Sequence, residues 1–268
     1  MKWMIRVDME GLTGVVNMKQ VVPGAEDYGF GLQMLKHDLA AVLEGLLQAE
    51  EDEVWLYDIH FYGTNVDLFQ LDPRVTAICG KPHYGPENLA FLDGSFDGMI
   101  LLGLHAKASM PGALLNHNYE HDIIKMSVNG VVVGEIGLEA LMAGEAGVPL
   151  VMVTADSEGV KETEALLPGT VTVSVKQSLG DNAAACYPPS RTAALLKAGA
   201  MECATAAKRL TPYTIAGPIE LDMQFKPGAL LDKLRVRLAA AFIEADRMVL
   251  TGDTVLEAWN QYLIAKSD

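Results

Sequence analysis

Acidic and histidine residues follow several short apolar runs of the 268-residue chain. They stand at the ends of three such runs and at the start of a helical stretch: Asp8 and Glu10, Asp58 and His60, His105, and Glu135. Because side chains alternate along a strand, Asp8 and Glu10 point the same way, as do Asp58 and His60. A carboxylate pair repels itself unless it is protonated or neutralised, and a divalent cation neutralises it well. The spacing therefore indicates a metal centre.

The residue types narrow the choice of metal and the number of ions. Mixed imidazole and carboxylate ligands suit zinc, manganese, cobalt or iron. A single catalytic zinc normally takes three protein ligands and keeps one position for water. The chain offers three acids and two histidines: Asp8, Glu10, Glu135, His60 and His105. Five ligands fit two metal ions that share one bridging carboxylate.

Each of these residues also has a structural explanation when it is taken alone. Asp8 and Glu10 fit caps for a tight turn, and His60 or His105 fits a hydrogen-bonded interior histidine. Glu135 fits the positive N-terminus of a helix, a contribution of about 0.3–1 kcal/mol. We favour a site because chance rarely places all five at the ends of neighbouring elements.

Two further histidines, His117 and His121, follow a predicted loop over 106–115. A loop histidine near a metal centre is a candidate acid, base or transition-state stabiliser, and a solvated loop histidine is the alternative. His37, on a predicted helix, and His83, in a loop rich in proline and glycine, are predicted to be structural.

The strand ends must meet for these residues to act together. Near-continuous apolar runs are typical of parallel strands that are covered on both faces. Leucines three and four residues apart predict a helix, and Asn129-Gly130 between two apolar runs predicts a tight hairpin. The predicted order is strand 2–7, helix 28–49, strands 54–59 and 98–104, hairpin strands 123–128 and 131–133, helix 136–146 and strand 149–154. This order predicts an α/β fold, with a largely parallel sheet flanked by helices and one hairpin.

The pattern is weaker after Asp156. It predicts helices over 160–167, 190–210, 230–245 and 254–265, and strands over 170–175, 215–225 and 248–250. Pro212, Pro218 and Pro227 interrupt this stretch. We therefore expect a metal-binding α/β domain over 1–211 and a smaller α+β C-terminal region over 212–268 packed on it.

Composition and charge exclude several classes of partner. The chain has 20 basic and 35 acidic residues and a formal charge of −15, whereas nucleic acids and anionic membranes need basic patches. No run of about 18 apolar residues occurs, so no membrane span is predicted. Arg6 and Asp8 interrupt the first apolar run before it is long enough for a signal peptide.

The three cysteines, Cys79, Cys186 and Cys203, lack the spacing of a disulfide framework or a zinc site. We therefore expect a cytoplasmic protein.

Motifs of competing chemistries are missing from the sequence. No H-E-x-x-H, G-x-S-x-G, Walker or G-x-G-x-x-G pattern occurs. Gly29-Phe30-Gly31 lacks a third glycine and does not follow a predicted strand. Serine-nucleophile, nucleoside-triphosphate and dinucleotide chemistry therefore lose support.

Several segments resemble, in collinear order, those of the DppA-type D-aminopeptidase family. Residues 7–15, Val-Asp-Met-Glu-Gly-Leu-Thr-Gly-Val, are similar to the S-x-D-x-E-G signature of that family. Further similar blocks lie at 58–65, which contains a D-x-H pattern, and at 95–106, 129–137, 147–154 and 175–184. The chain departs from the family at two positions. Arg6 stands in place of the signature serine, and Phe61 stands where a glycine is usual.

This resemblance implies a function and a set of ligands. Members of the family are dizinc aminopeptidases that release N-terminal D-amino acids from short peptides, and they assemble as ring-shaped homo-oligomers whose sites face an internal space. By this resemblance Asp8 bridges two zinc ions. Glu10 and His60 complete the coordination of one ion, and His105 and Glu135 that of the other.

By the resemblance, His117 matches the proposed catalytic histidine of the family. Our hypothesis for the mechanism is that protonated His117 and a zinc ion stabilise the developing oxyanion. A bridging hydroxide attacks the first peptide bond, and one zinc binds the free α-amine of the substrate. The departures at Arg6 and Phe61 leave open another metal-dependent amidase or peptidase. An alternative from a different class is a non-catalytic oligomer that binds metal or peptide.

Overall fold

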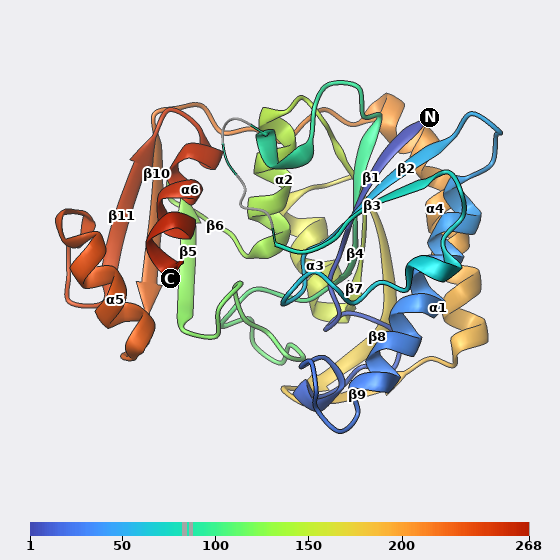
Figure 1. The fold of residues 1–268 in the computed structure, drawn as a ribbon, viewed down its shortest axis with the longest axis horizontal. Coiled ribbons are helices and arrows are strands. Elements are labelled where there is room, and N and C mark those ends of the chain that lie inside the picture. The colour runs from blue at the N-terminus through green and yellow to red at the C-terminus, as the bar shows by residue number, and fades with distance from the viewer. Residues whose placement is uncertain (82–84, 86–87, 268) are drawn as a thin grey trace.

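A computed structural model describes all residues of the chain except 82–84, 86–87 and 268. Its larger sheet has seven strands in the order β3-β2-β1-β4-β7-β8-β9 (Figure 1). The strands are β1 (Lys2–Val7), β2 (Glu53–Asp58), β3 (Val75–Ile78), β4 (Gly98–Leu104), β7 (Leu150–Asp156), β8 (Val171–Gly180) and β9 (Ala183–Cys186). Neighbouring strands are parallel, apart from the antiparallel pair β8 and β9.

The strand order reverses at β1. From β1 the chain moves outward to β2 and β3, and it then returns to β4 on the other side of β1. Ligand sites in open α/β sheets form beyond the carboxyl ends of the strands at such a reversal. Val7 of β1 is paired with Asp58 of β2 and Leu102 of β4. The residues that follow these three strands therefore meet at one edge of the sheet.

Helices cover both faces of the larger sheet (Figure 1). α1 (Tyr28–Leu46) and α4 (Pro189–Arg209) pack together over the face to which Ile5 contributes. α2 (Glu135–Glu145) and α3 (Ser157–Leu166) lie over the opposite face, to which Met4 contributes. Successive side chains of β1 enter two different hydrophobic cores, and its apolar residues Trp3, Met4, Ile5 and Val7 therefore occur on both faces of the strand.

A smaller antiparallel sheet, with the order β11-β10-β5-β6, forms the other end of the molecule (Figure 1). Its strands are β5 (Ile123–Val128), β6 (Val131–Val132), β10 (Ile219–Phe225) and β11 (Arg247–Gly252). α5 (Ala229–Arg237) and α6 (Val255–Lys266) accompany this sheet, and α6 contacts α2. Asn129 and Gly130 both have positive φ, 47° and 82°, so the predicted hairpin turn is confirmed.

The α/β fold class is confirmed, and the position of the hairpin is the main difference from the prediction. The hairpin lies in the smaller sheet, where Met126 is paired with Met223 and Val128 with Leu221. These four side chains are buried in the core that also contains α2, so pairing with β10 removes them from water. The smaller sheet takes β5 and β6 from residues 1–211 and β10 and β11 from residues 212–268. The division of the chain into two domains at this boundary stays a prediction.

Most predicted elements lie within a few residues of the observed ones, whereas β3 and β9 were not predicted. The helix predicted over 230–245 ends at Arg237 and is followed by the short 3₁₀ helix η4 (Ala239–Ala241). The other 3₁₀ helices are η1 (Met18–Gln20), η2 (Leu68–Gln70) and η3 (Leu89–Phe91). Among the described residues no helix is long and apolar enough to cross a membrane.

Candidate metal centre

A pocket of about 340 Å³ opens beyond the carboxyl ends of β1 and β2. Four of the five predicted ligands line it: Asp8, Glu10, His60 and Glu135. The fifth, His105, follows β4, and its Nε2 lies 3.5 Å from Asp8 Oδ2 and 3.2 Å from Glu135 Oε1. All five side chains are at most 7% exposed. The structure therefore brings the five residues together at one buried place.

Asp8 lies between two groups of side chains. Its Oδ1 is 2.9 Å from His60 Nδ1, and the same nitrogen is 3.4 Å from Glu10 Oε2. Its Oδ2 faces His105, which in turn contacts Glu135. The two oxygens of one carboxylate thus point to two different pairs, each made of one histidine and one glutamate. This is the arrangement that a carboxylate shared between two cations requires.

Backbone carbonyls hold one ring nitrogen of each histidine. His60 Nε2 lies 2.9 Å from Val21 O, and His105 Nδ1 lies 3.0 Å from Ala106 O. When these nitrogens carry the proton and donate it, the other ring nitrogen has a free lone pair that faces the carboxylates. Such a hydrogen bond fixes the tautomer and the ring orientation of a metal-ligating histidine.

Three buried ligand atoms make no hydrogen bond within the described part of the chain: Asp8 Oδ2, Glu10 Oε2 and His105 Nε2. A buried polar atom without a partner costs about 1–3 kcal/mol, and more when it is charged. All three face the same small space, and two are carboxylate oxygens while the third is an imidazole nitrogen. Their chemistry fits a divalent cation, which suggests that the site is built for metal.

The electrostatics of the metal-free cluster support the same conclusion. Burial and the adjacent charge of Glu10 raise the pKa of Asp8 to about 6. Burial opposes the charged form of His60, yet Glu10 and Asp8 outweigh it and raise the pKa of His60 to about 11. Glu135 similarly outweighs burial and raises the pKa of His105 to about 10. The carboxylates therefore favour positive charge at this place. Without a metal, protons on the two histidines supply that charge.

His117 lies at the same centre. Its Nδ1 is 2.9 Å from Leu115 O, and its Nε2 is 3.9 Å from Glu135 Oε1. Its ring stacks on His105 at 4.0 Å and on His121 at 4.3 Å. The ligand atoms of His105, His117 and Glu135 all lie within 4.8 Å of one another, as do those of Asp8, Glu10 and His105. His117 is thus placed either to act beside a metal or to bind one.

The loop after β1 is held by residues that the sequence analysis did not single out. Lys176, completely buried on β8, donates to three backbone carbonyls of this loop at 2.6–2.7 Å. The backbone and hydroxyl of Thr13 donate to Asp38 on α1. At Gly11 a Cβ would lie 1.8 Å from Leu104 O, which explains the glycine of the D-x-E-G segment. In the sequence Lys176 follows alternating polar and apolar residues, as a surface residue of a strand does, so no local pattern indicated its burial.

Asp58 belongs to the scaffold of the centre. Its carboxylate accepts hydrogen bonds from the backbone and side chain of Asn65 at 2.6–3.1 Å and from the backbone of His60 at 3.2 Å. These bonds hold the 58–65 loop in place.

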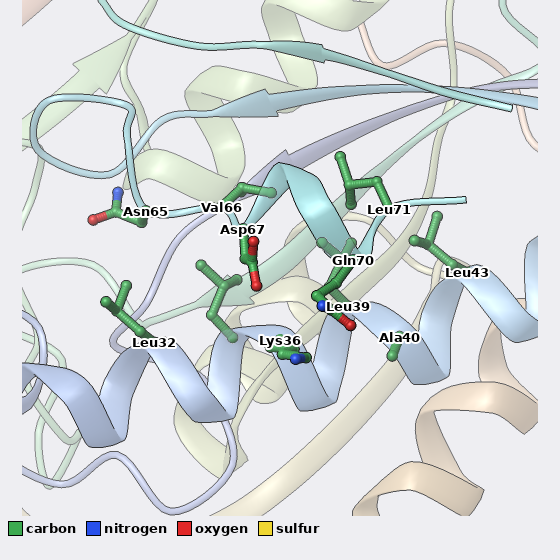
Figure 2. A pocket seen from close by; sticks show the side chains of 11 residues that line it. Leu32, Lys36, Leu39, Ala40, Leu43, Asn65, Val66, Asp67, Gln70 and Leu71 are labelled. Carbon is green, nitrogen blue, oxygen red and sulfur yellow. The ribbon is translucent and has the colours of Figure 1, made fainter. Parts of the chain in front are cut away.

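A second hollow, of about 130 Å³, lies between α1 and residues 65–71 (Figure 2). Leucine side chains dominate that hollow, which lies apart from the metal-ligating residues.

Two of the remaining histidines were predicted to be structural. His37 Nδ1 lies 2.8 Å from Asp38, and its Nε2 lies 3.0 Å from Pro189 O at the start of α4. His37 therefore links α1 to α4. His83 lies outside the described residues.

Arg6, the first departure from the signature, does not line the pocket. Its guanidinium is fully buried, forms an ion pair with Glu139 on α2, and donates to Ala90 O at 2.6 Å. Glu139 also accepts from the Tyr119 hydroxyl at 3.0 Å, and the Tyr119 amide donates to Glu135 at 2.6 Å. Arg6 is therefore connected to the predicted ligand Glu135 through two intermediate residues.

Phe61, the second departure, does line the pocket. Its φ is +44°, which is a left-handed conformation that glycine adopts without strain. Its ring is 42% exposed and meets the ring of His60 edge-on at 4.8 Å. The glycine usual in the family at this position is thus explained by the backbone, and the phenyl ring adds an aromatic wall to the pocket.

The strain at Phe61 gives a testable prediction. Phe61→Gly and Phe61→Ala both remove the ring. Alanine adopts the left-handed backbone of this position with strain, whereas glycine adopts it without strain. We expect the glycine variant to exceed the alanine variant in free energy of unfolding by about 1 kcal/mol, as measured by urea denaturation of the metal-loaded proteins. An alanine variant at least as stable as the glycine variant would contradict the assigned conformation.

A buried cluster of carboxylates and imidazoles beyond the carboxyl ends of parallel strands is typical of metal-dependent hydrolases. The chain belongs to the Peptidase M55 family, described as D-aminopeptidase, whose model matches residues 1–263. The family membership that segments 7–15 and 58–65 suggested is therefore confirmed.

Two relatives illustrate this membership. A D-aminopeptidase of Bacillus subtilis (strain 168) is 33% identical over 217 residues, which cover 79% of this chain and 78% of that protein. A solved structure, described as the Zn-dependent D-aminopeptidase DppA from Bacillus subtilis, a self-compartmentalizing protease, superposes with a TM-score of 0.91 at 26% identity. That match covers 99% of this chain and 96% of the other.

Proposed function

We propose that this protein is a zinc-dependent aminopeptidase that releases N-terminal D-amino acids of the D-alanine type from short peptides at a dinuclear centre. The observation that carries the proposal is the position of Asp8, whose two oxygens face two separate pairs of histidine and glutamate. Zinc is the metal we propose because the structural neighbour is described as Zn-dependent. Other divalent metals that accept this ligand set are the alternatives.

The proposal assigns each ligand to a metal position. Asp8 is shared, Glu10 and His60 complete one position, and His105 and Glu135 complete the other. When bound, the two ions supply the Lewis-acid chemistry that turns water into a nucleophile near neutral pH. The protein supplies the geometry, because the carbonyls of Val21 and Ala106 fix the two imidazole rings.

His117 is the proposed catalytic residue. The carbonyl of Leu115 holds its Nδ1, which leaves Nε2 on the side of Glu135 and the pocket. A protonated Nε2 donates a hydrogen bond to the oxygen that becomes negative when the peptide carbonyl is attacked. A donor of this kind is worth about 3–4 kcal/mol in the transition state.

We further propose a ring-shaped homo-oligomer. The structural neighbour is described as self-compartmentalizing, and several large apolar side chains of this chain are exposed on 60–71: Phe61 42%, Tyr62 69%, Leu68 56% and Phe69 97%. Exposed apolar side chains that cluster in this way are typical of surfaces that other chains cover.

A cytoplasmic location is also proposed. Cys79, Cys186 and Cys203 are all free thiols, as is usual in a reducing compartment.

A related amidase or peptidase specificity is the second candidate, and Phe61 favours it. Its ring occupies the pocket wall where the family usually has a glycine, so it narrows the space beside His60. A non-catalytic metal-binding or peptide-binding oligomer remains the alternative from another class.

Counting metals while assaying a substrate panel tests the proposal. We expect two zinc ions per chain, hydrolysis of D-alanyl dipeptides in preference to their L-counterparts, and complete loss of hydrolysis after chelation with recovery on adding zinc. Hydrolysis that survives complete metal removal would contradict the proposal. Preference for L-substrates or simple amides would favour the second candidate, and bound metal without any hydrolysis would favour the non-catalytic alternative.

A further inference from the structure

The outer wall of the metal-site pocket carries charged residues that the proposed chemistry does not use. Lys81, Glu120 and Lys266 line this pocket together with the metal-ligating residues. Lys81 follows β3 of the larger sheet, and Lys266 ends α6 beside the smaller sheet. The two lysines therefore reach one pocket from opposite ends of the molecule.

Lys266 is held in a defined position. Its ammonium forms an ion pair with Glu120, so its charge is already matched by a carboxylate. Lys233 donates to the carbonyl of Lys266 at 2.7 Å, and Arg237 donates to that of Ala265 at 3.0 Å. These contacts fix the end of α6 against α5 and leave little freedom for Lys266 to leave the pocket.

Lys81 differs because, among the described residues, its ammonium contacts a neutral backbone carbonyl and forms no ion pair with a carboxylate. Its ammonium donates to the carbonyl of Ile59, next to His60. Burial and the positive charge of Lys266 lower the pKa of Lys81, while Asp8 and Glu135 act in the opposite sense. The ammonium of Lys81 therefore interacts electrostatically with both Lys266 and the metal-ligating acids.

Metal binding changes this balance of charge. In the loaded centre the charges of Asp8, Glu10 and Glu135 are taken up by cations, and Glu120 is paired with Lys266. Among the described residues of the pocket, no carboxylate is then left to match the positive charge of Lys81. An exposed lysine on the wall of a ligand pocket is a site for an anionic group of the ligand.

A short peptide carries an anion at its C-terminus. An aminopeptidase substrate places its α-amine at the metal centre, and an extended residue spans about 3.3–3.6 Å. The C-terminal carboxylate of a dipeptide therefore lies roughly 7 Å from the amine, and that of a tripeptide about 10 Å away. A pocket of about 340 Å³ is large enough for such a ligand, and its wall carries Lys81 together with the metal-ligating residues.

We propose that Lys81 binds the C-terminal carboxylate of the peptide substrate, with the Lys266–Glu120 pair bounding its position. This inference rests on the proposed aminopeptidase function and adds a second requirement to it. The site selects peptides by a free C-terminus as well as a free N-terminus, and so it favours dipeptides and tripeptides over longer chains and over peptide amides.

Binding to the zinc-loaded full chain carrying His117→Ala tests this inference while turnover is slowed by the expected roughly 10²–10³-fold, and the peptide is checked for hydrolysis after each titration. The probes are D-Ala-D-Ala and D-Ala-D-Ala amide, which differ only in the C-terminal charge, and calorimetry gives both Kd values. We expect the acid to bind about tenfold or more tightly than the amide, since a charge-assisted contact has about that effect. Adding Lys81→Met should bring the two Kd values together, whereas adding Lys81→Arg should keep most of the difference.

Each other outcome decides against the inference. Equal binding of the acid and the amide, or no binding of either, overturns it. A preference for the acid that survives Lys81→Met overturns the role of Lys81, and a preference that is lost only in Lys266→Met transfers the role to Lys266. The Kd values of the acid and the amide are compared within the same variant. A general loss of stability affects both Kd values alike and therefore does not change their ratio. Hydrolysis of D-peptides by the unmodified chain tests the proposed function separately.

Discussion

Asp8→Asn is expected to remove both metal ions from the protein and to lower the rate of D-alanyl dipeptide hydrolysis by roughly 10³-fold or more. Asparagine keeps the size of the side chain but not the charge that two cations share. Because each oxygen of Asp8 faces a different pair of ligands, one substitution weakens both positions. Metal content by atomic spectroscopy and initial rates measured on the same samples check this result.

Glu10→Gln and Glu135→Gln are the matched controls for this experiment. Each removes one carboxylate that belongs to a single metal position, so each variant should keep about one ion per chain. Two retained ions in Asp8→Asn would show that Asp8 is not a shared ligand. Loss of both ions in all three variants would instead indicate one cooperative centre without separate positions.

His117→Ala is expected to lower kcat by roughly 10²–10³-fold while KM and metal content stay near the values of the unmodified protein. The reason is that a proton donor to the oxyanion acts only in the transition state. Since the ligand atoms of His105, His117 and Glu135 lie within 4.8 Å of one another, the metal content is the decisive reading. An equal fall in metal content and activity would make His117 a ligand.

His121→Ala is the control for His117. The ring of His121 stacks on that of His117 at 4.3 Å, and within the described part of the chain it forms no hydrogen bond or ion pair with the carboxylates. We expect a loss of about tenfold or less, because only the orientation of His117 is affected. A larger loss than in His117→Ala would move the acid–base role to His121.

The cluster of candidate metal ligands was predictable because charged residues are unusual at these positions in the sequence. Asp8 and His105 end runs of side chains that enter two hydrophobic cores, and such runs identify parallel strands whose carboxyl ends meet. Charged groups at those ends have few structural uses, so their joint occurrence was informative. Spacing alone did not assign roles, and the resemblance to a family supplied the shared position of Asp8 and the catalytic role of His117.

Other features depend on contacts between distant parts of the chain, which local patterns do not encode. β5 is paired with β10, which lies about ninety residues later in the chain, and nothing in the hairpin sequence specifies that partner. β3 has only four residues, all at least partly exposed, so it lacks the apolar run of a buried strand. Lys176 resembles a surface residue in sequence, and only the three carbonyls around its ammonium explain its burial.

The contacts of Arg6 have a consequence for how this chain diverged from its relatives. Serine at position 6 would leave the Glu139 carboxylate buried without its cation, a loss of about 3–5 kcal/mol, and a neutral residue at position 139 would do the same to the guanidinium. Exchanging both residues together avoids that loss. The two positions are therefore expected to be strongly epistatic, so that a return to the signature serine is accessible only through a compensating change on α2.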